Sequence, residues 1–375
     1  ARIYMKCFKI KIRLSSSVLT PFHSDTLWGH ICWALRYLNG EMELESFLKS
    51  HSNGETLLII SNAFPKGYLP YPVLPPIGKG KAKALIDRFW KADDFVVGVS
   101  ALKSLLKIPY LSREIFIRRM EEEISNEFFM GLILEDRNIC PIIADYLPDA
   151  CPNKYDENGK IACGFISSSK NKCPPKYKAQ FKNNRIEEAV TYHSKINRFS
   201  GTTIERSLFT TEDTFFGNEE FEAYCKIGTG FSLEKLTRCL EFINNYGYGK
   251  KKSTGKGNIN CTIENGDPGI STTQANAFMT LSNYVPKTGD PTNGYYRVLT
   301  KYGKLGGHFA SSPITNEGNP MPFKYPLIMF EAGSVFISDG KTMNYGRIVN
   351  GMHAIKNPDI AHYGIAYPLL LKVKV

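Results

Sequence analysis

Long apolar runs are missing from this chain of 375 residues. No stretch approaches the roughly 18 to 20 apolar residues that cross a bilayer. The opening stretch, ARIYMKCFKIKIRL, also lacks the apolar core of a secretory signal peptide. We therefore expect a cytoplasmic protein with no membrane partner.

Paired cysteines are also missing, because none of the nine cysteines forms a CxxC motif. An odd number with irregular spacing predicts reduced thiols in a reducing compartment. Four cysteines fall in one polar stretch, but their spacing matches no common zinc knuckle. We therefore expect no metal and no cofactor, and we keep a weak zinc candidate beside the interpretation as plain thiols: Cys140, Cys151, Cys163 and Cys173.

The sequence also has no evident set of catalytic residues. Neither a pair of carboxylates nor a Ser-His-Asp arrangement stands out. The charge balance is distinctive, since 47 Lys and Arg face 36 Asp and Glu for a net charge of +11. Much of the excess falls between Lys170 and Arg206. Clustered cations displace counterions from phosphates, so nucleic acid is the favoured partner, ahead of a membrane surface or mere solubility.

Two strand–helix–strand units are predicted on either side of a long irregular stretch. The first has a strand in which Phe8, Ile10, Ile12 and Leu14 alternate with basic residues, predicting a basic outer face. A helix capped by Ser24 or Asp25 follows and ends at Gly40, and the strand ETLLIISNAFP completes the unit. The second unit has the strand FEAYCKIG, the helix FSLEKLTRCLEFINNYG and the strand NINCTIENGD.

This order predicts an α+β, ferredoxin-like (RRM-like) domain over 1–266, with an insertion over about 64–216. Within the insertion we expect helices over 82–91 and 113–130. After Pro268 the chain has strand-like runs separated by Gly and Pro, and the last alternates Leu371, Val373 and Val375 with lysines. We interpret 267–375 as a second, β-rich ferredoxin-like domain, which makes the fold a tandem one.

The stretch NNYGYGKKKSTGKGNIN, residues 244–260, resembles a phosphate-binding loop at first sight. It is not a Walker P-loop, because Gly249 and Gly255 are too far apart and Gly257 follows Lys256 where Ser or Thr is needed. It also follows a helix instead of opening one. Its glycines and lysines suit a clamp on a sugar-phosphate backbone, with Tyr246 and Tyr248 as stacking surfaces. The alternative is a flexible surface loop that is basic for solubility.

A family resemblance rests on four blocks: FHSDTLWGHICWALRYL, SNAFPKGYLPYPVLPPIGK, INRFSGTTIERSLFTTEDTFF and VLTKYGKLGG. Together with a glycine-rich loop before the last strand of a ferredoxin-like domain, they resemble the RAMP superfamily of CRISPR-associated RNA-binding proteins. Within it they are similar to the type III-A subunit that holds the 5′ handle of the guide RNA. The stretch from Cys140 to Lys182 aligns with nothing in the family.

The resemblance implies a non-catalytic subunit of an antiviral ribonucleoprotein complex. Its partners would be the crRNA 5′ handle, the large polymerase-like subunit, a backbone RAMP subunit and, indirectly, target RNA. The RNA-binding residues that it implies lie in the glycine-rich loop, at the entry to the first helix, in a protruding hairpin and in a C-terminal turn: Gly247, Tyr248, Gly249, Lys250, Lys251, Lys252, Gly255, Lys256, Gly257, Ser24, Asp25, Asn197, Arg198, Thr202, Thr203, Arg206, Lys304, Gly306 and Gly307.

Three alternatives stay open at this point. Ser24 and Asp25 could simply cap the helix. Some members of the superfamily are endoribonucleases that cut guide precursors with a general acid–base histidine, for which His23 and His193 are candidates, whereas His30 fits the helix itself. A phosphate-binding enzyme of another kind is the third possibility.

Overall fold

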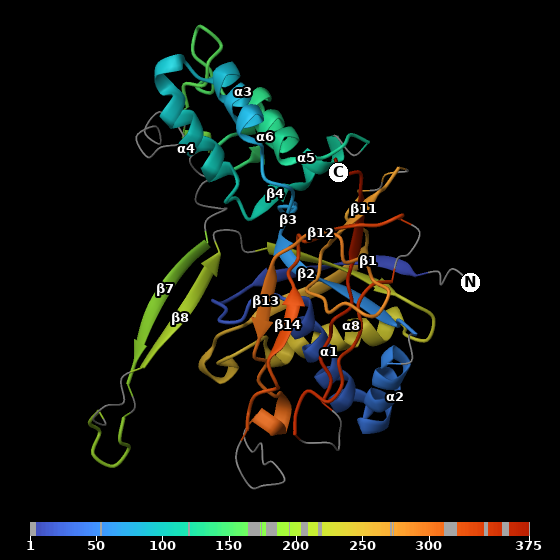
Figure 1. Ribbon diagram of the computed structural model, residues 1–375. Coiled ribbons are helices and arrows are strands. Elements are labelled where there is room, and N and C mark those ends of the chain that lie inside the picture. Colours follow the sequence, from blue (N-terminus) through green and yellow to red (C-terminus); the bar gives the residue numbers. More distant parts are fainter. Residues whose placement is uncertain are drawn as a thin grey trace.

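The computed structural model in Figure 1 describes most of the chain. The described residues are 5–52, 55–118, 121–163, 173, 175–177, 186–194, 196–203, 209–216, 220–270, 272, 274–310, 321–340, 344–354 and 360–374. No helix in these ranges is both long and apolar enough to cross a membrane.

A four-stranded antiparallel sheet lies at the centre of the N-terminal part of the chain and contains strands from both predicted strand–helix–strand segments. It consists of β1 (Lys6–Leu14), β2 (Leu58–Pro65), β9 (Glu220–Ile227) and β10 (Ile259–Asn265) in the order β10-β1-β9-β2. Two helices, α1 (Ser24–Asn39) and α8 (Leu233–Tyr246), pack against each other beside it (Figure 1). The predicted strand–helix–strand order on both sides of a long intervening stretch is therefore present. A further helix, α2 (Glu41–Ser52), was not predicted.

The outer face of β1 is less basic than its sequence predicts. The apolar residues alternate inward as expected, with Ile10 and Ile12 only 2% and 1% exposed. Lys9 Nζ lies 3.1 Å from carboxylate oxygens of both Glu222 and Glu264, which belong to the two neighbouring strands. The cross-strand carboxylates therefore offset part of the positive charge on this face.

A group of short helices occupies the chain between β2 and β9. Its elements are β3 (Tyr68–Pro70), α3 (Lys79–Phe89), the 3-10 turn η1 (Ala92–Asp94), α4 (Phe95–Leu105), β4 (Tyr110–Ser112), α5 (Arg113–Arg118), α6 (Asn126–Glu135), β5 (Ile139–Cys140) and β6 (Asp145–Tyr146). The single helix predicted over 113–130 is wrong. Two helices form instead, and Ser125 caps the second by accepting a hydrogen bond from the Phe128 amide at 3.1 Å.

A two-stranded hairpin extends from the body of the molecule (Figure 1). It pairs β7 (Ile186–His193) with β8 (Phe209–Phe216), and an isolated bridge between Ile196 and Thr203 extends the pairing toward its far end. The resemblance implied a hairpin here, whereas the residue pattern by itself does not reveal the two strands.

The C-terminal part of the chain, 267–375, contains a separate four-stranded sheet in the order β12-β15-β11-β16. Its strands are β11 (Ala277–Thr280), β12 (Gly294–Tyr295), β15 (Val335–Ile337) and β16 (Pro368–Leu371), and β13 (Val298–Lys301) pairs with β14 (Leu327–Phe330) nearby. The helical structure in the described part of 267–375 is one 3-10 turn, η4 (Gly307–Ala310). This part is β-rich as predicted, but a second ferredoxin-like plan is not confirmed.

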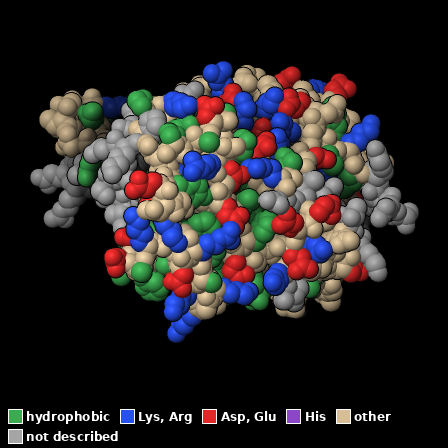
Figure 2. All heavy atoms as spheres, turned by 90° about the horizontal axis from the view of Figure 1, so that it is seen from above, with side chains coloured by type: hydrophobic (Ala, Val, Ile, Leu, Met, Phe, Trp, Pro, Cys, Tyr) green, Lys and Arg blue, Asp and Glu red, His purple; other side chains and the backbone are tan. Residues whose placement is uncertain are grey.

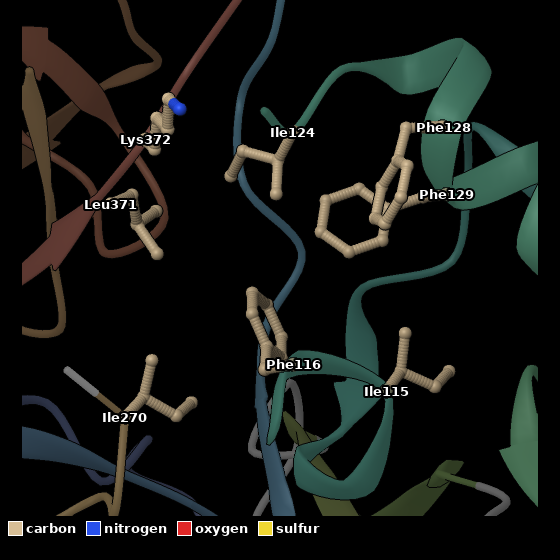
Figure 3. A pocket seen from close by; sticks show the side chains of 8 residues that line it. All are labelled: Ile115, Phe116, Ile124, Phe128, Phe129, Ile270, Leu371 and Lys372. Carbon is tan, nitrogen blue, oxygen red and sulfur yellow. The ribbon is translucent and has the colours of Figure 1, made fainter. Parts of the chain in front are cut away.

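An apolar pocket lies where the helical group meets the C-terminal strand (Figure 3). Its lining residues come from α5, α6 and the segments beside them: Ile115, Phe116, Ile124, Phe128, Phe129, Ile270, Leu371 and Lys372. Ile124 also forms a parallel bridge with Val373. Lys372 is the one titratable side chain in this lining, and the other lining side chains are apolar.

The end of the molecule formed by α3–α6 has no single charge sign. Seen from above in Figure 2, Lys and Arg side chains are mixed with Asp and Glu over this face. Mixed charges give a weak net field, so the face is a poor candidate for a polyanion.

Candidate nucleic-acid interface

The glycine-rich loop leaves the C-terminus of α8 and returns to β10 in a fixed course. Five of its residues have left-handed or related positive φ values: Gly247, Gly249, Lys251, Gly255 and Gly257. The Tyr248 amide donates to the Gly257 carbonyl at 2.8 Å, which closes the loop at its base. A 3-10 turn, η3 (Lys252–Thr254), forms its tip. The loop therefore forms a ring that is closed by a hydrogen bond at its base.

Residues just after β1 hold this ring from outside. The Gly257 amide donates to the Ser17 carbonyl at 2.9 Å, and the Lys250 amide donates to Thr20 Oγ1 at 3.1 Å. A Cβ at Gly249 would lie 2.6 Å from Thr20 Oγ1, so glycine is needed for the close approach as well as for its φ. The sequence analysis missed Ser17 and Thr20, because their role depends on a contact across more than 200 residues.

His30 is a second anchor that the sequence analysis treated as an ordinary helical residue. Its Nε2 accepts a hydrogen bond from the Gly249 amide at 3.0 Å. Burial, followed by the nearby Lys252 charge, lowers the pKa of His30 to about 3. The imidazole is thus neutral at physiological pH, which is the form that has a lone pair on Nε2 to accept this bond.

Tyr248 does not present its ring to a base. The side chain is 1% exposed, its hydroxyl donates to the Pro21 carbonyl at 2.7 Å, and its ring stacks on Phe22 with centroids 4.7 Å apart. The predicted stacking role of Tyr248 is therefore wrong, since both faces are used inside the protein. Tyr246, by contrast, is 62% exposed.

The lysines of the ring lie on its outer side. Lys250, Lys251 and Lys252 are exposed, whereas Lys256 is half-buried with its Nζ 3.0 Å from Ser17 Oγ. Partial burial lowers the pKa of Lys252 from its ordinary value. The ring therefore presents three exposed lysine side chains, and among its four glycines Gly255 is the one whose added Cβ would meet nothing within 4 Å.

Ser24 and Asp25 are used inside the fold. The helix begins at Ser24 after an N-cap residue, His23, whose side chain makes no capping bond. A distant side chain satisfies the first helical amide, because Asn62 Oδ1 accepts from Ser24 N at 2.8 Å. Ser24 is fully buried and the Asp25 side chain is 6% exposed. Both predicted roles, capping by these side chains and direct contact with RNA, are therefore wrong.

Asp25 instead belongs to a buried charged cluster that links α1 to residues of the C-terminal part of the chain, 267–375. Its Oδ2 lies 3.0 Å from Lys301 Nζ and 3.6 Å from His362 Nε2. Burial alone would raise the pKa of Asp25, but Lys301 and then the histidines outweigh it and hold the pKa below its usual range. Burial lowers the pKa of His23 and of His362 to about 4 each, and that of Lys324 to about 8.

The C-terminal turn meets α1 close to the loop. A Cβ on Gly306 or Gly307 would lie 2.2 or 2.3 Å from ring atoms of Trp33, one helical turn beyond His30. Lys304 is exposed at the start of this turn. The two glycine-rich segments, distant in sequence, thus approach successive turns of the same helix.

The remaining predicted residues lie on other elements. Asn197, Arg198, Thr202 and Thr203 are exposed at the far end of the β7–β8 hairpin. Arg206 lies outside the described residues.

The four cysteines of the zinc candidate lie in one part of the helical group without forming a metal centre. Cys140 and Cys151 share an apolar cluster, and Cys173 packs against it. No group of three or more His, Cys, Asp or Glu in the described residues could hold a metal ion. Burial raises the pKa of Cys140 to about 12. The structure thus does not support the zinc candidate.

His23, one of the two histidines suggested for RNA cleavage, is poorly placed for it. His23 is largely buried, and its pKa of about 4 leaves little of the protonated form at neutral pH. The side chain of His193 lies outside the described residues.

Comparison with known proteins finds similarity at the level of structure. No protein-family model matches the chain, and no curated protein matches it. A chain of the Csm3–Csm4 subcomplex of the type III-A CRISPR–Cas interference complex is 16% identical with a TM-score of 0.55, over 99% of this chain and 100% of that chain. A chain of a Csm1–Csm4 cassette in complex with pppApA is 14% identical with a TM-score of 0.50, over 98% of this chain and 99% of that chain. At these identities the likeness establishes a shared fold.

Proposed function

We propose that this protein is an RNA-binding subunit of a type III-A CRISPR interference complex, similar to Csm4. In this proposal it clasps the repeat-derived 5′ handle of the crRNA, and it docks a large polymerase-like subunit and a backbone RAMP subunit. The end-to-end likeness to chains from Csm1–Csm4 and Csm3–Csm4 complexes supports the choice of complex and partners. The contact with target RNA would be indirect.

The observation that carries the RNA-binding role is the anchored ring of residues 247–257. It is closed at its base, tied to residues 17–20 and to His30, and edged by exposed lysines. A preformed ring loses little conformational entropy on binding, and its exposed lysine side chains can approach backbone phosphates. We place Gly247, Gly249, Lys250–Lys252 and Gly255–Gly257 in this interface, and we leave out Ser24, Asp25 and Tyr248.

The first experiment changes the charge of the ring. In Lys250→Ala/Lys251→Ala/Lys252→Ala we expect weaker RNA binding and a shallower dependence on salt, by roughly 0.7 slope unit for each phosphate of the single strand that is no longer neutralised. Fluorescence anisotropy at several salt concentrations measures both. Lys83→Ala/Lys103→Ala/Lys107→Ala is the matched control, because it removes the same charge from exposed positions on α3 and on and after α4. An equal weakening in both variants would remove the ring from the interface.

The second experiment addresses the handle and the complex. RNA that copurifies with the native complex should share one repeat-derived 5′ end, and random 5′ ends would count against the proposal.

We further propose that the protein is not catalytic. Incubation of the isolated protein with repeat-containing precursor RNA, without metal, should leave the RNA intact. Specific cleavage that His23→Ala or His193→Ala abolishes would favour the endoribonuclease alternative.

A further inference from the structure

A continuous row of aromatic rings runs over the outer side of α1 and α8. In order these are Phe309 of η4, Trp33 and Tyr37 of α1, and Phe242 and Tyr246 of α8. Successive ring centroids are 6.2, 5.8, 5.6 and 4.2 Å apart. We call these five residues the aromatic row.

The helical period explains how the row arises. Trp33 and Tyr37 are four residues apart on α1, as are Phe242 and Tyr246 on α8, so each pair lies on one face of its helix. The packing of α1 against α8 brings Tyr37 onto Phe242 in a nearly parallel stack, with 16° between the ring planes. Contact between the helices thereby joins two short pairs into one row.

The two ends of the row coincide with the two glycine-rich segments. Tyr246 directly precedes Gly247, the first glycine of the ring, and Gly306 and Gly307 pack on Trp33. Cations border the row, since Arg36 lies over the Trp33 ring at 5.4 Å and the Lys252 side chain runs beside Gly247. Glu41 is the acidic neighbour, 3.1 Å from Arg36. The row therefore meets the ring at Tyr246 and the C-terminal turn at Trp33.

Two rings of the row remain open to solvent although they are held by neighbours. Tyr37 is 58% exposed and Tyr246 is 62% exposed, while Trp33, Phe242 and Phe309 are half-buried beneath and between them. A large aromatic side chain that is already stacked on one side has given up much of its rotational freedom. A planar ligand that stacks on its open side therefore binds at a lower entropic cost.

On this basis, and resting on the proposed function, we propose that the aromatic row is a stacking surface for unpaired RNA bases beside the ring that holds the backbone. Bases stack on aromatic faces irrespective of sequence, with about 1 to 3 kcal/mol per base.

The test uses two probes of equal charge: a ten-nucleotide single-stranded oligoadenylate, and an abasic ribose-phosphate chain of the same length. We expect the wild-type protein to bind the oligoadenylate at least about tenfold more tightly, as one stacked base would provide. Tyr37→Leu/Tyr246→Leu should remove most of this preference and leave the salt dependence unchanged. Tyr37→Phe/Tyr246→Phe is the matched control, because it keeps both rings and should keep the preference.

Fluorescence locates the binding surface. The chain has three tryptophans, and Trp28 and Trp90 are each 3% exposed, so quenching by the oligoadenylate reports mainly on half-buried Trp33. We expect quenching with the oligoadenylate and little with the abasic chain. Circular dichroism confirms that each variant is folded.

The outcomes separate this inference from the proposed function. Equal affinity for the two probes, or an unchanged preference in Tyr37→Leu/Tyr246→Leu, overturns the stacking surface while RNA binding by the lysines stands. Failure to bind either probe or copurified RNA overturns both. If the leucine variant keeps the preference but no longer copurifies with the large or backbone subunit, a protein covers the row and the inference is wrong.

Discussion

Gly255 and Gly257 differ in one respect that makes them a useful pair of positions. Both have positive φ values, +80° and +69°. A Cβ on Gly255 would meet nothing within 4 Å, whereas a Cβ on Gly257 would lie 1.9 Å from the Tyr248 carbonyl oxygen. A side chain at Gly255 therefore incurs only backbone strain, but at Gly257 it also pushes the two ends of the ring apart.

We predict that Gly257→Ala lowers the free energy of unfolding by about 3 kcal/mol and that Gly255→Ala lowers it by about 1 kcal/mol. Gly257→Ala should also weaken RNA binding more than Gly255→Ala does. Urea titration and anisotropy with the same RNA measure the two effects. Equal effects at the two positions would mean that the close contact between Tyr248 and Gly257 does not determine the conformation of the ring.

At the level of residues, the sequence predicted which segment forms the candidate interface. It was less successful in predicting which side chains are exposed there. The glycines and lysines of 247–257 could be recognised from composition and from their place after a helix. The burial of Tyr248, Ser24 and Asp25 could not, because it depends on Phe22, Asn62 and Lys301, which approach only in the folded chain. The anchoring role of His30 was missed for the same reason.

Lys154 links the end of α6 to β5 in the helical group. It is fully buried, and its Nζ donates to the carbonyls of Ile133 and Asp136 at the end of α6 and, at 3.0 Å, to that of Ile139 in β5. A cation at this position satisfies carbonyls that the helix end leaves without partners. Burial lowers the pKa of Lys154 to about 8, so it is mostly charged at neutral pH.

We predict that Lys154→Met destabilises the protein by at least about 2 kcal/mol, because the buried carbonyls lose their donor. Lys160 provides the matched control. Its Nζ donates to the Asp87 and Arg88 carbonyls near the end of α3, but in an exposed position, so Lys160→Met should change stability by less than about 0.5 kcal/mol. Chemical denaturation measures the free energy of unfolding of both variants. A loss in Lys154→Met as small as that in Lys160→Met would contradict a structural role for Lys154.

Among the elements, those with a strong period were predicted well. The alternation in β1 and the apolar run of β2 identified both strands, and the stripes of α1 and α8 identified both helices. The helix pair α5 and α6 was merged into one because its apolar pattern continues across the break. Helices α2 and α4 were missed. The weak pairs β3–β4 and β5–β6 have two or three residues a strand, too few to show a period.

On the scale of the whole molecule, buried neutral histidines make stability depend on pH. The pKa values of His23 and His362 in the charged cluster are about 4, and that of His30 is about 3, all below the ordinary value of 6.5. Burial is the largest cause in each case. Since the unfolded chain binds these protons first, stability is fully present above pH 6.5 and is lost as pH falls toward 4.

We therefore predict that lowering the pH from 7 to 5 reduces the free energy of unfolding by about 2 kcal/mol for each of these histidines. Urea unfolding at the two pH values measures the change. His362→Gln should remove about one histidine's share of the dependence, whereas Asp25→Asn should lower stability at both pH values by unpairing Lys301. The same stability at pH 5 and pH 7 would contradict the assignment of neutral buried rings.

The arrangement of whole units was predictable only in part. A return to the strand–helix–strand order after a long irregular stretch identified one sheet built from two distant segments. The plan of the second sheet could not be derived, because its strands are only two to four residues long. Its described connections lack helices that a 3.6-residue period would reveal.

The place of β1 between β9 and β10 has a consequence for biosynthesis. β1 ends at Leu14, whereas its partners begin at Glu220 and Ile259. At roughly 5 to 20 residues per second, the ribosome needs on the order of ten seconds or more to supply them. During that time Ile10 and Ile12 have no native neighbours on either side, while the helical group between β2 and β9 has already been synthesised. The nascent chain thus exposes an unpaired first strand for this time, and the candidate interface can assemble only after the ring of residues 247–257 has been synthesised.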